Sequence, residues 1–276
     1  MTVMGRLRAP PVFIGIRLLG HFESVIDFDT HISYGALQAR MAQQQPHRSP
    51  IFCAPVGECW LRPAQKLNAV DIRYAEQLGY RIKLLGIAKR ATVNGKEGVE
   101  LRVHPTLIPN KRLIANVEGA MNAVLVQGDA VGATLYSGKG AGSEPTASAV
   151  IADLVDITRL ATADPEHRVP HLAFQPNAMT NIEILPMSEV TTSYYLRMNV
   201  EDQPGVLADL TRILADGTIS IDAMMQKEPA EGETRTDIIF LTHQTQEKNV
   251  TAAIAKMEAL TTVHGTVTKI RLENLS

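Results

Sequence analysis

Cysteine is nearly absent from this sequence of 276 residues, which contains only Cys53 and Cys59. Their C-x5-C spacing fits neither a zinc knuckle nor a redox C-x-x-C motif. No second cysteine pair is available to complete a tetrahedral zinc site. We therefore expect two ordinary reduced thiols and no metal site.

Long apolar runs and an excess of charge of either sign are also lacking. No run approaches the roughly 20 apolar residues that a membrane-spanning helix requires. A signal peptide needs an unbroken apolar core, which Pro10 and Pro11 interrupt near the N-terminus. The formal net charge of -2 gives no attraction to nucleic acid or to anionic membranes. We therefore expect a cytoplasmic protein without nucleic acid or a membrane as a partner.

The chain divides into segments of different composition, and its length is typical of about two domains. Prolines interrupt residues 1–65, where we predict a short strand within Val12–Leu19, a helix at about 34–43 and otherwise poor organisation. Residues 163–192 are a proline-rich linker. Because this linker also contains apolar side chains, we expect it to lie along a surface.

Residues 66–162 have the pattern of an α+β domain. Apolar residues recur at helical spacing in AVDIRYAEQLG. Two β-type runs, YRIKLLGIAKRA and GVELRVHPTLI, flank the hairpin signal Asn94-Gly95, and two more flank a Gly-Asp turn at 128–129. A helix is predicted from about Pro145. We expect a mixed sheet with helices on one face.

Residues 193–272 predict a second domain. Its expected strands are SYYLRMNVE, TISIDAMMQKEP, ETRTDIIFLTHQ and VHGTVTKIRLE, and its expected helices are PGVLADLTRILAD and TQEKNVTAAIAKMEAL. The resulting β-α-β-β-α-β order is that of the ferredoxin-like fold. Such a sheet uses one face for its helices and leaves the other for a partner.

A glycine-rich turn in residues 136–157, YSGKGAGSEPTASAVIADLVDI, is the sharpest local signal. Glycine allows close approach to the backbone, and the N–H groups that open a helix favour a phosphate, pyrophosphate or carboxylate. The alternative is a tight turn between strand and helix. The spacing is not that of the usual dinucleotide fingerprint.

The turn E-D-Q-P-G-V-L before the first helix of the second domain is the other signal. Asp202 or Gln203 is predicted to cap this helix, with Pro204 in its first turn. The N–H groups there can hold a carboxylate, and Asp202 can accept from an ammonium group. A purely structural turn is the alternative.

Four strings in the first domain carry a family resemblance: DIRYAEQLGYRIKLLGIAKR, GVELRVHPTLIP, NAVLVQGDAVG and GAG-x-x-PTASAV-x-ADL-x-DI. In this order they resemble the C-terminal part of the homoserine dehydrogenase catalytic domain. The resemblance implies interconversion of L-homoserine and L-aspartate 4-semialdehyde with NAD or NADP. It also implies that the glycine turn meets the cofactor through Gly140, Ala141, Gly142 and Thr146.

The chain departs from that family in its first 65 residues, where no G-x-G-x-x-G is found. We interpret it as lacking the family's N-terminal nucleotide-binding domain. The family's proton-transfer lysine and substrate carboxylates are not found either. Asp27, Asp29 and Lys66 match no motif, so the catalytic residues stay unassigned.

Residues 194–228 resemble the ACT regulatory domain through their strand, D-x-P-G-V-L turn and helix. The resemblance implies an amino-acid effector, L-threonine, bound by Asp202, Gln203, Pro204, Gly205, Val206 and Leu207. It also implies a homodimer or higher homo-oligomer. The alternative function is a truncated, inactive chain that serves only as an amino-acid-binding dimerisation module.

Overall fold

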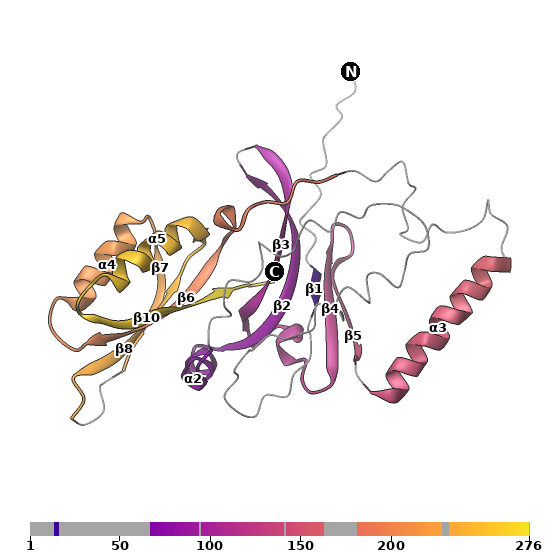
Figure 1. Cartoon of the computed structure of the whole chain (residues 1–276), viewed down its shortest axis with the longest axis horizontal. Helices are drawn as coiled ribbons and strands as arrows, with labels where there is room; N and C mark the ends of the chain where they lie inside the picture. The colour runs from indigo at the N-terminus through magenta and orange to yellow at the C-terminus, as the bar shows by residue number, and fades with distance from the viewer. Residues whose placement is uncertain are drawn as a thin grey trace, which may run out of the picture.

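One mixed β-sheet runs through both parts of the chain (Figure 1). The computed structural model describes residues 14–16, 67–93, 95–140, 142–162, 181–227 and 232–275. Among these residues the strand order is β5-β4-β1-β2-β3-β10-β6-β8-β7. Cys53, Cys59, the helix predicted at 34–43 and residues 163–180 lie outside the described residues.

The first part contains β1 (Ile14–Ile16), α2 (Ala69–Gln77), β2 (Tyr80–Val93), β3 (Lys96–Pro109), η1 (Leu113–Asn116), β4 (Met121–Gly128), β5 (Gly132–Lys139) and α3 (Ser143–Thr162). Its strands pair antiparallel, and β1 lies between β2 and β4. The predicted helix and hairpins are confirmed. The short strand predicted within Val12–Leu19 is present as β1.

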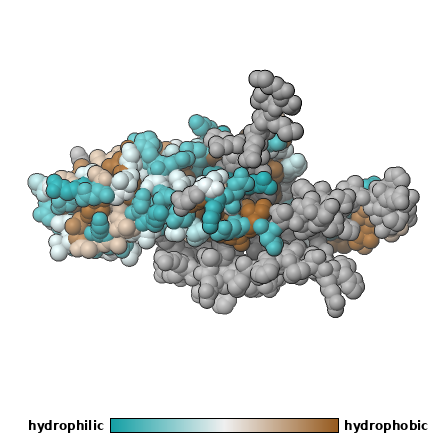
Figure 2. All heavy atoms as spheres, turned by 90° about the horizontal axis from the view of Figure 1, so that it is seen from above, coloured by the Kyte–Doolittle hydropathy of each residue, from teal (hydrophilic) through white to brown (hydrophobic). Residues whose placement is uncertain are grey.

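The expectation that helices cover one face of the first sheet is wrong for α3. This helix starts at Ser143, earlier than predicted, because Gly142 has a φ of 121° and ends the extended backbone. Nearly all of its residues are exposed. Its exposed apolar residues include Val150, Ile151, Leu154, Val155 and Ile157. Apolar surface is visible at this end of the molecule, opposite the second domain (Figure 2).

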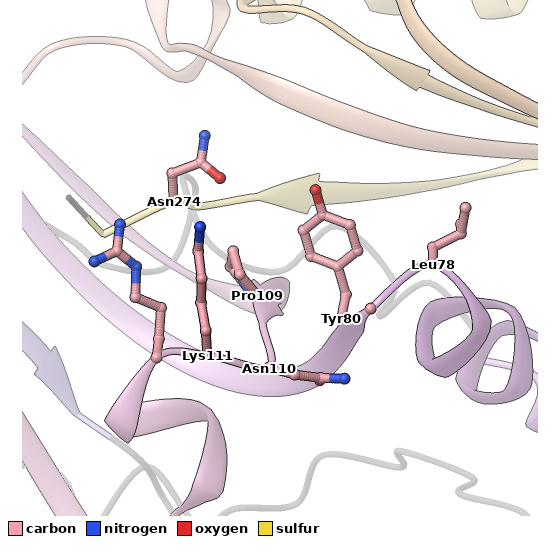
Figure 3. A pocket seen from close by; sticks show the side chains of 8 residues that line it. Leu78, Tyr80, Pro109, Asn110, Lys111 and Asn274 are labelled. Atoms are coloured by element: carbon pink, nitrogen blue, oxygen red, sulfur yellow. The ribbon is translucent and has the colours of Figure 1, made fainter.

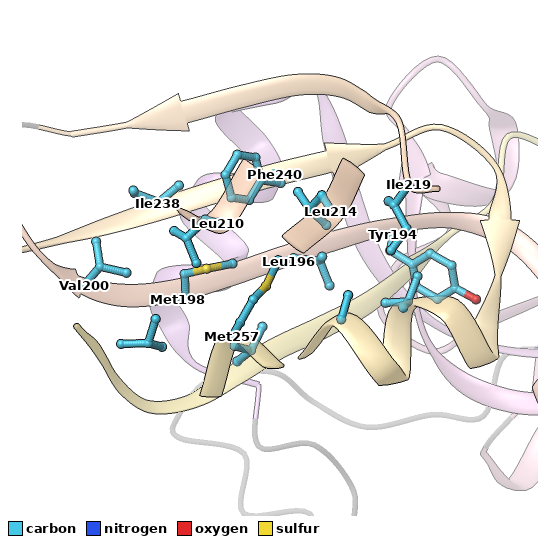
Figure 4. Close-up of a cluster of buried hydrophobic side chains, with 14 of the residues drawn as sticks. Tyr194, Leu196, Met198, Val200, Leu210, Leu214, Ile219, Ile238, Phe240 and Met257 are labelled. Carbon is cyan, nitrogen blue, oxygen red and sulfur yellow. The ribbon is translucent and has the colours of Figure 1, made fainter. Parts of the chain in front are cut away.

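The second part contains η4 (Met187–Glu189), β6 (Thr191–Glu201), α4 (Val206–Asp216), β7 (Ile221–Gln226), β8 (Arg235–Thr242), β9 (Thr245–Gln246), α5 (Glu247–Glu258) and β10 (Val263–Leu272). The predicted βαββαβ order is confirmed. Alternate residues of β6 point to α4 and α5 and form the main core with Leu210, Leu214, Phe240 and Met257 (Figure 4). Each buried side chain of this size stabilises the fold by about 1.5–3 kcal/mol.

The other face of this sheet is covered by α2, which corrects the expectation that it is left for a partner. The other alternate side chains of β6, β8 and β10 form a second cluster with the helix. That cluster contains Tyr74, Ala75, Leu107, Tyr195, Ile239, Leu241, Ile270 and Leu272. The apolar stripe of α2 is therefore buried against the second domain, because the two parts share one sheet and the helix reaches across it.

Asp71 of α2 is the polar centre of this contact, and its side chain is fully buried. Its two carboxylate oxygens accept from Arg197 Nε at 2.6 Å and from Arg197 Nη2 at 3.2 Å. The Tyr195 hydroxyl and the Asn68 backbone N–H also donate to it, each at 3.0 Å. Burial alone would lower the pKa of Arg197, but the hydrogen bonds and charge of Asp71 outweigh burial and raise it. Arg197 therefore stays charged.

The two parts also meet at the strand edges and through the end of the linker. β10 pairs in parallel with β3, Arg271 opposite Thr106 and Leu272 opposite Leu107. The Leu185 N–H donates to the Val99 carbonyl at 2.9 Å. The expectation that the linker lies along a surface holds for its described end.

Replacing Asp71 with alanine should destabilise the protein by about 3–5 kcal/mol, because Arg197 would remain buried and charged with only the more distant Asp237 carboxylate, at 3.8 Å. Urea unfolding followed by circular dichroism measures the loss. Asp156→Ala is the matched control, since Asp156 forms an exposed pair with Arg159 of the kind that contributes about 0–1 kcal/mol. Equal losses in the two variants would contradict the central role of Asp71.

Candidate functional site

The E-D-Q-P-G-V-L turn forms one wall of a cavity of about 330 Å³ in the second domain. All six residues predicted to bind an effector line it: Asp202, Gln203, Pro204, Gly205, Val206 and Leu207. Val200, Glu201, Gln226 and Ile238 complete the lining. The structure therefore brings together every residue that the sequence motif singled out, and adds Gln226 from β7 and Ile238 from β8.

Gly205 sets the geometry of this cavity. Its φ of 98° and ψ of -28° place it in the left-handed region as the N-cap of α4, a conformation that favours glycine. The helix has no side-chain cap, so the prediction that Asp202 or Gln203 caps it is wrong, and Pro204 precedes the helix. The reason is that the turn itself supplies the bond: the Val206 N–H donates to the Gln203 carbonyl at 3.4 Å.

The cavity combines a helix N-terminus with a carboxylate. N–H groups in the first turn of α4 have no carbonyl partner inside the helix, so they present partial positive charge. The Asp202 side chain is exposed, and among the described residues its Oδ1 accepts only a long hydrogen bond, 3.4 Å, from Gln226 Nε2. The Glu201 carboxylate is held by His264 and Arg235. Asp202 is thus the carboxylate best placed to accept from an ammonium group.

This cavity adjoins the α2 contact through two strands. Gln226 precedes Lys227, whose Nζ lies 4.9 Å from the centroid of the Tyr74 ring on α2. Ile238 follows Asp237, which accepts a hydrogen bond of 3.3 Å from the Tyr74 hydroxyl. Two of the strands that line the cavity, β7 through the adjacent Lys227 and β8 through Asp237, therefore also hold Tyr74.

The glycine turn before α3 is arranged as a tight connection. A Cβ on Gly140 would lie 1.3 Å from Asn122 Nδ2, so a larger residue there would displace the Asn122 side chain. Gly142 needs its left-handed φ of 121°. Thr146 donates through its hydroxyl to the Gly142 carbonyl at 2.8 Å and through its N–H at 3.2 Å. Ala141 lies outside the described residues.

These residues fit only one end of a nicotinamide dinucleotide. Gly142 and the first-turn N–H groups of α3 are exposed and can meet an anionic or amide group. The described residues provide no facing wall, because α3 itself is exposed along its length. No chemical step can be assigned to this turn alone.

A buried polar cluster, missed by the sequence analysis, lies where β3 and β10 meet. Arg102 is 1% exposed and pairs with Glu100 at 2.9 Å and with Glu273 at 2.6 Å. On β10, Arg271 makes two hydrogen bonds with Glu247, at 2.7 and 2.8 Å. Burial alone would raise the pKa of Glu247, but Arg271 and Lys269 lower it to about 2.

Local sequence patterns contain only partial signals for these overlooked residues. Asn68 and Asp71 form a capping box that a sequence pattern can suggest, but not the contact of Asp71 with Arg197. Arg102 and Glu100 alternate along a strand as solvated residues also do. Only pairing with β10 makes them buried.

Matches to known protein families divide the chain into the same two parts. The family model "Homoserine dehydrogenase" matches residues 30–155, and the model "ACT domain" matches residues 194–260. The first match begins inside the segment left unmatched above. The second part of the chain is therefore an ACT domain, and the part before it belongs to an oxidoreductase catalytic domain. The chain belongs to the homoserine dehydrogenase family.

Individual relatives support the same family assignment. A homoserine dehydrogenase from Neisseria gonorrhoeae is 54% identical over 79% of this chain and 49% of its own length. One from Methylobacillus glycogenes is 57% identical over 78% of this chain and 46% of its own. The crystal structure of a homoserine dehydrogenase from Thiobacillus denitrificans superposes with a TM-score of 0.68 at 69% identity, covering 76% of this chain and 46% of that one. The chain thus spans about half the length of the curated relatives that it matches.

Membrane-spanning helices are not found among the described residues, where none is both long and apolar enough.

The stability of the junction should depend on pH through His104, which burial, Arg271 and Arg102 hold at a pKa of about 3. Between pH 6.5 and 3 the unfolded chain binds a proton that the native protein does not, so the free energy of unfolding falls as the pH falls. The expected slope from this group is about 1.4 kcal/mol per pH unit.

Urea unfolding of the parent and of His104→Gln at pH 6.5, 5.5 and 4.5 measures this slope, and the variant should lose this part of it. Glu247 stays ionised over this range because its pKa is about 2. Parallel curves for the two proteins would refute the assignment.

Proposed function

We propose that the chain acts in NAD(P)-dependent interconversion of L-homoserine and L-aspartate 4-semialdehyde, as a cytoplasmic homo-oligomer regulated by an amino acid. The observation that carries the regulatory part is the single cavity lined by the whole D-Q-P-G-V-L motif. The catalytic part rests on family membership. Catalytic residues stay unassigned.

The chemistry of the cavity supports a small amino acid as its ligand. The α4 N-terminus complements an α-carboxylate, and Asp202 complements an α-ammonium group. Val200 and Ile238 offer apolar surface to a short side chain. L-threonine, the effector implied by the family resemblance, has a carboxylate, an ammonium group and a short side chain with one methyl group.

Regulation can reach the catalytic part through α2. Tyr74 is held by Lys227 and Asp237, each next to a residue that lines the cavity. Asp71, one helical turn earlier, anchors the same helix to Arg197. A ligand that shifts β7 or β8 would therefore act on α2, which leads directly into β2.

The partner interface is proposed at β7. Among the described strands β7 pairs only with β8, so its outer edge carries no strand. An open edge is a site for strand pairing. The other edge of the ACT sheet is already paired with β3.

L-threonine should bind the purified chain saturably in isothermal titration calorimetry, and Asp202→Asn should weaken binding by about tenfold to a hundredfold, the value of a hydrogen bond to a charged group. Asp216→Asn, at the far end of α4, is the matched control and should bind normally. Isoleucine, methionine and lysine test the identity of the ligand. Absence of heat with all four amino acids would count against the proposed sensing role.

Homoserine oxidation by the same sample, followed as NADH or NADPH absorbance, tests the catalytic part. Threonine-inhibited turnover would support the catalytic part of the proposal. Threonine binding without turnover would favour the second candidate, a non-catalytic amino-acid-binding module. The observation that favours this candidate is that described residues line the ACT cavity, whereas among the described residues the glycine turn has no facing wall.

A further inference from the structure

A second cavity, of about 580 Å³, lies where α2, the β2–β3 hairpin and the end of the ACT domain meet (Figure 3). Its lining comes from the end of α2, the start of β2, the turn after β3 and the residue that follows β10 by two positions. These residues are Leu78, Gly79, Tyr80, Pro109, Asn110, Lys111, Arg112 and Asn274. The cavity is thus formed jointly by the two parts of the chain, and it is of the size that small ligands occupy.

The backbone around this cavity is firmly held. The Asn110 N–H donates to the Gly79 carbonyl at 2.9 Å. The Asn116 side chain donates to the carbonyls of Asn110 and Arg112, at 2.9 and 3.1 Å. The Glu273 N–H donates to the Leu107 carbonyl at 3.0 Å and so fixes the tail that carries Asn274. The lining side chains therefore project from a rigid frame.

The charge of the lining is positive. Lys111 and Arg112 make no ion pair within the described part of the chain, and no carboxylate is among the lining residues. In Figure 3 the Lys111 ammonium group and the Tyr80 hydroxyl point to the side where the Asn274 amide lies. Arg112 Nε is buried and has no hydrogen-bond partner among the described residues. A buried donor left without a partner costs about 1–3 kcal/mol and calls for a bound group.

We propose that this cavity binds a small organic anion through a carboxylate or phosphate group, held by Lys111 and Arg112. Guanidinium and ammonium donors make charge-assisted hydrogen bonds to both kinds of group. Asn274 supplies a neutral donor from the ACT side. Burial and, after it, the nearby Asp222 carboxylate raise the pKa of Tyr80. The Tyr80 hydroxyl therefore stays a neutral donor in the lining of the cavity.

This site is separate from the proposed effector cavity. The two cavities share no lining residue. α2 connects them, because Tyr74 contacts the strands of one cavity and Leu78 lines the other. An anion held by both Asn274 and the hairpin would hold the ACT domain against the catalytic part. This contact requires neither bound threonine nor turnover.

Titration of the purified chain with inorganic phosphate, and separately with malonate, tests the proposal at constant ionic strength. Calorimetry and the shift of the unfolding midpoint are the readouts. Saturable binding of at least one anion is expected, and the two titrations distinguish a phosphate ligand from a carboxylate ligand. The Lys111→Gln/Arg112→Gln variant should lose about tenfold or more in affinity, equal to about 1.4 kcal/mol.

Arg90→Gln/Lys96→Gln is the matched control, because it removes the same charge from exposed residues at the opposite end of the same hairpin. Its affinity should equal that of the parent. Lys111→Glu, an exposed single change, tests the site should the double variant fail to fold. Equal losses in the control, unchanged affinity in Lys111→Glu, or no saturable binding of either anion overturns the proposal. Loss of threonine binding or of activity alone leaves it standing.

Discussion

The carboxylate of Asp71 takes part in three interactions that together fix the position of α2. It closes the capping box that starts α2, it pairs with Arg197 on β6, and it accepts from the Tyr195 hydroxyl. A buried ion pair of this kind adds little net stability when it is intact, because desolvation offsets the attraction. Its contribution is to the position of the helix, because this placement of α2 on the ACT sheet brings the two charges together. The second core cluster depends on that placement.

The shared sheet has a related consequence. β3 supplies Arg102 and β10 leads to Glu273, so the strand pairing that joins the two parts also completes a buried salt bridge. Separating the parts would remove Glu273 from Arg102 and Arg197 from Asp71, and it would expose the apolar cluster beneath α2. The ACT domain is therefore integrated into the catalytic part and is more than a domain attached by a linker.

Local sequence patterns were sufficient to predict most helices and strands and the residues of the effector turn. Helical spacing predicted α2, the Asn-Gly and Gly-Asp signals predicted both hairpins, and the βαββαβ order followed from the alternation of elements in 193–272. The D-Q-P-G-V-L residues are contiguous, so their assembly into one cavity needed no long-range contact. Asp71 and Arg197 are separated by 126 residues, and Arg102 and Glu273 by 171. Pairings at such distances depend on the register of β3 against β10, which no local pattern specifies.

The position of α2 also constrains how regulation can work. One end of the helix is held at Asp71, and its middle contacts, through Tyr74, the strands that line the effector cavity. Its C-terminal end contributes Leu78 to the second cavity, which is proposed to bind an anion. Packed interfaces of this kind tend to change between discrete arrangements rather than deform continuously. In the proposed regulation, a ligand at either cavity therefore acts by favouring one placement of α2. Since binding linkage is reciprocal, an anion at the hairpin and an amino acid at the ACT turn would each raise the affinity for the other where both favour the same placement. They would lower it where they favour different placements.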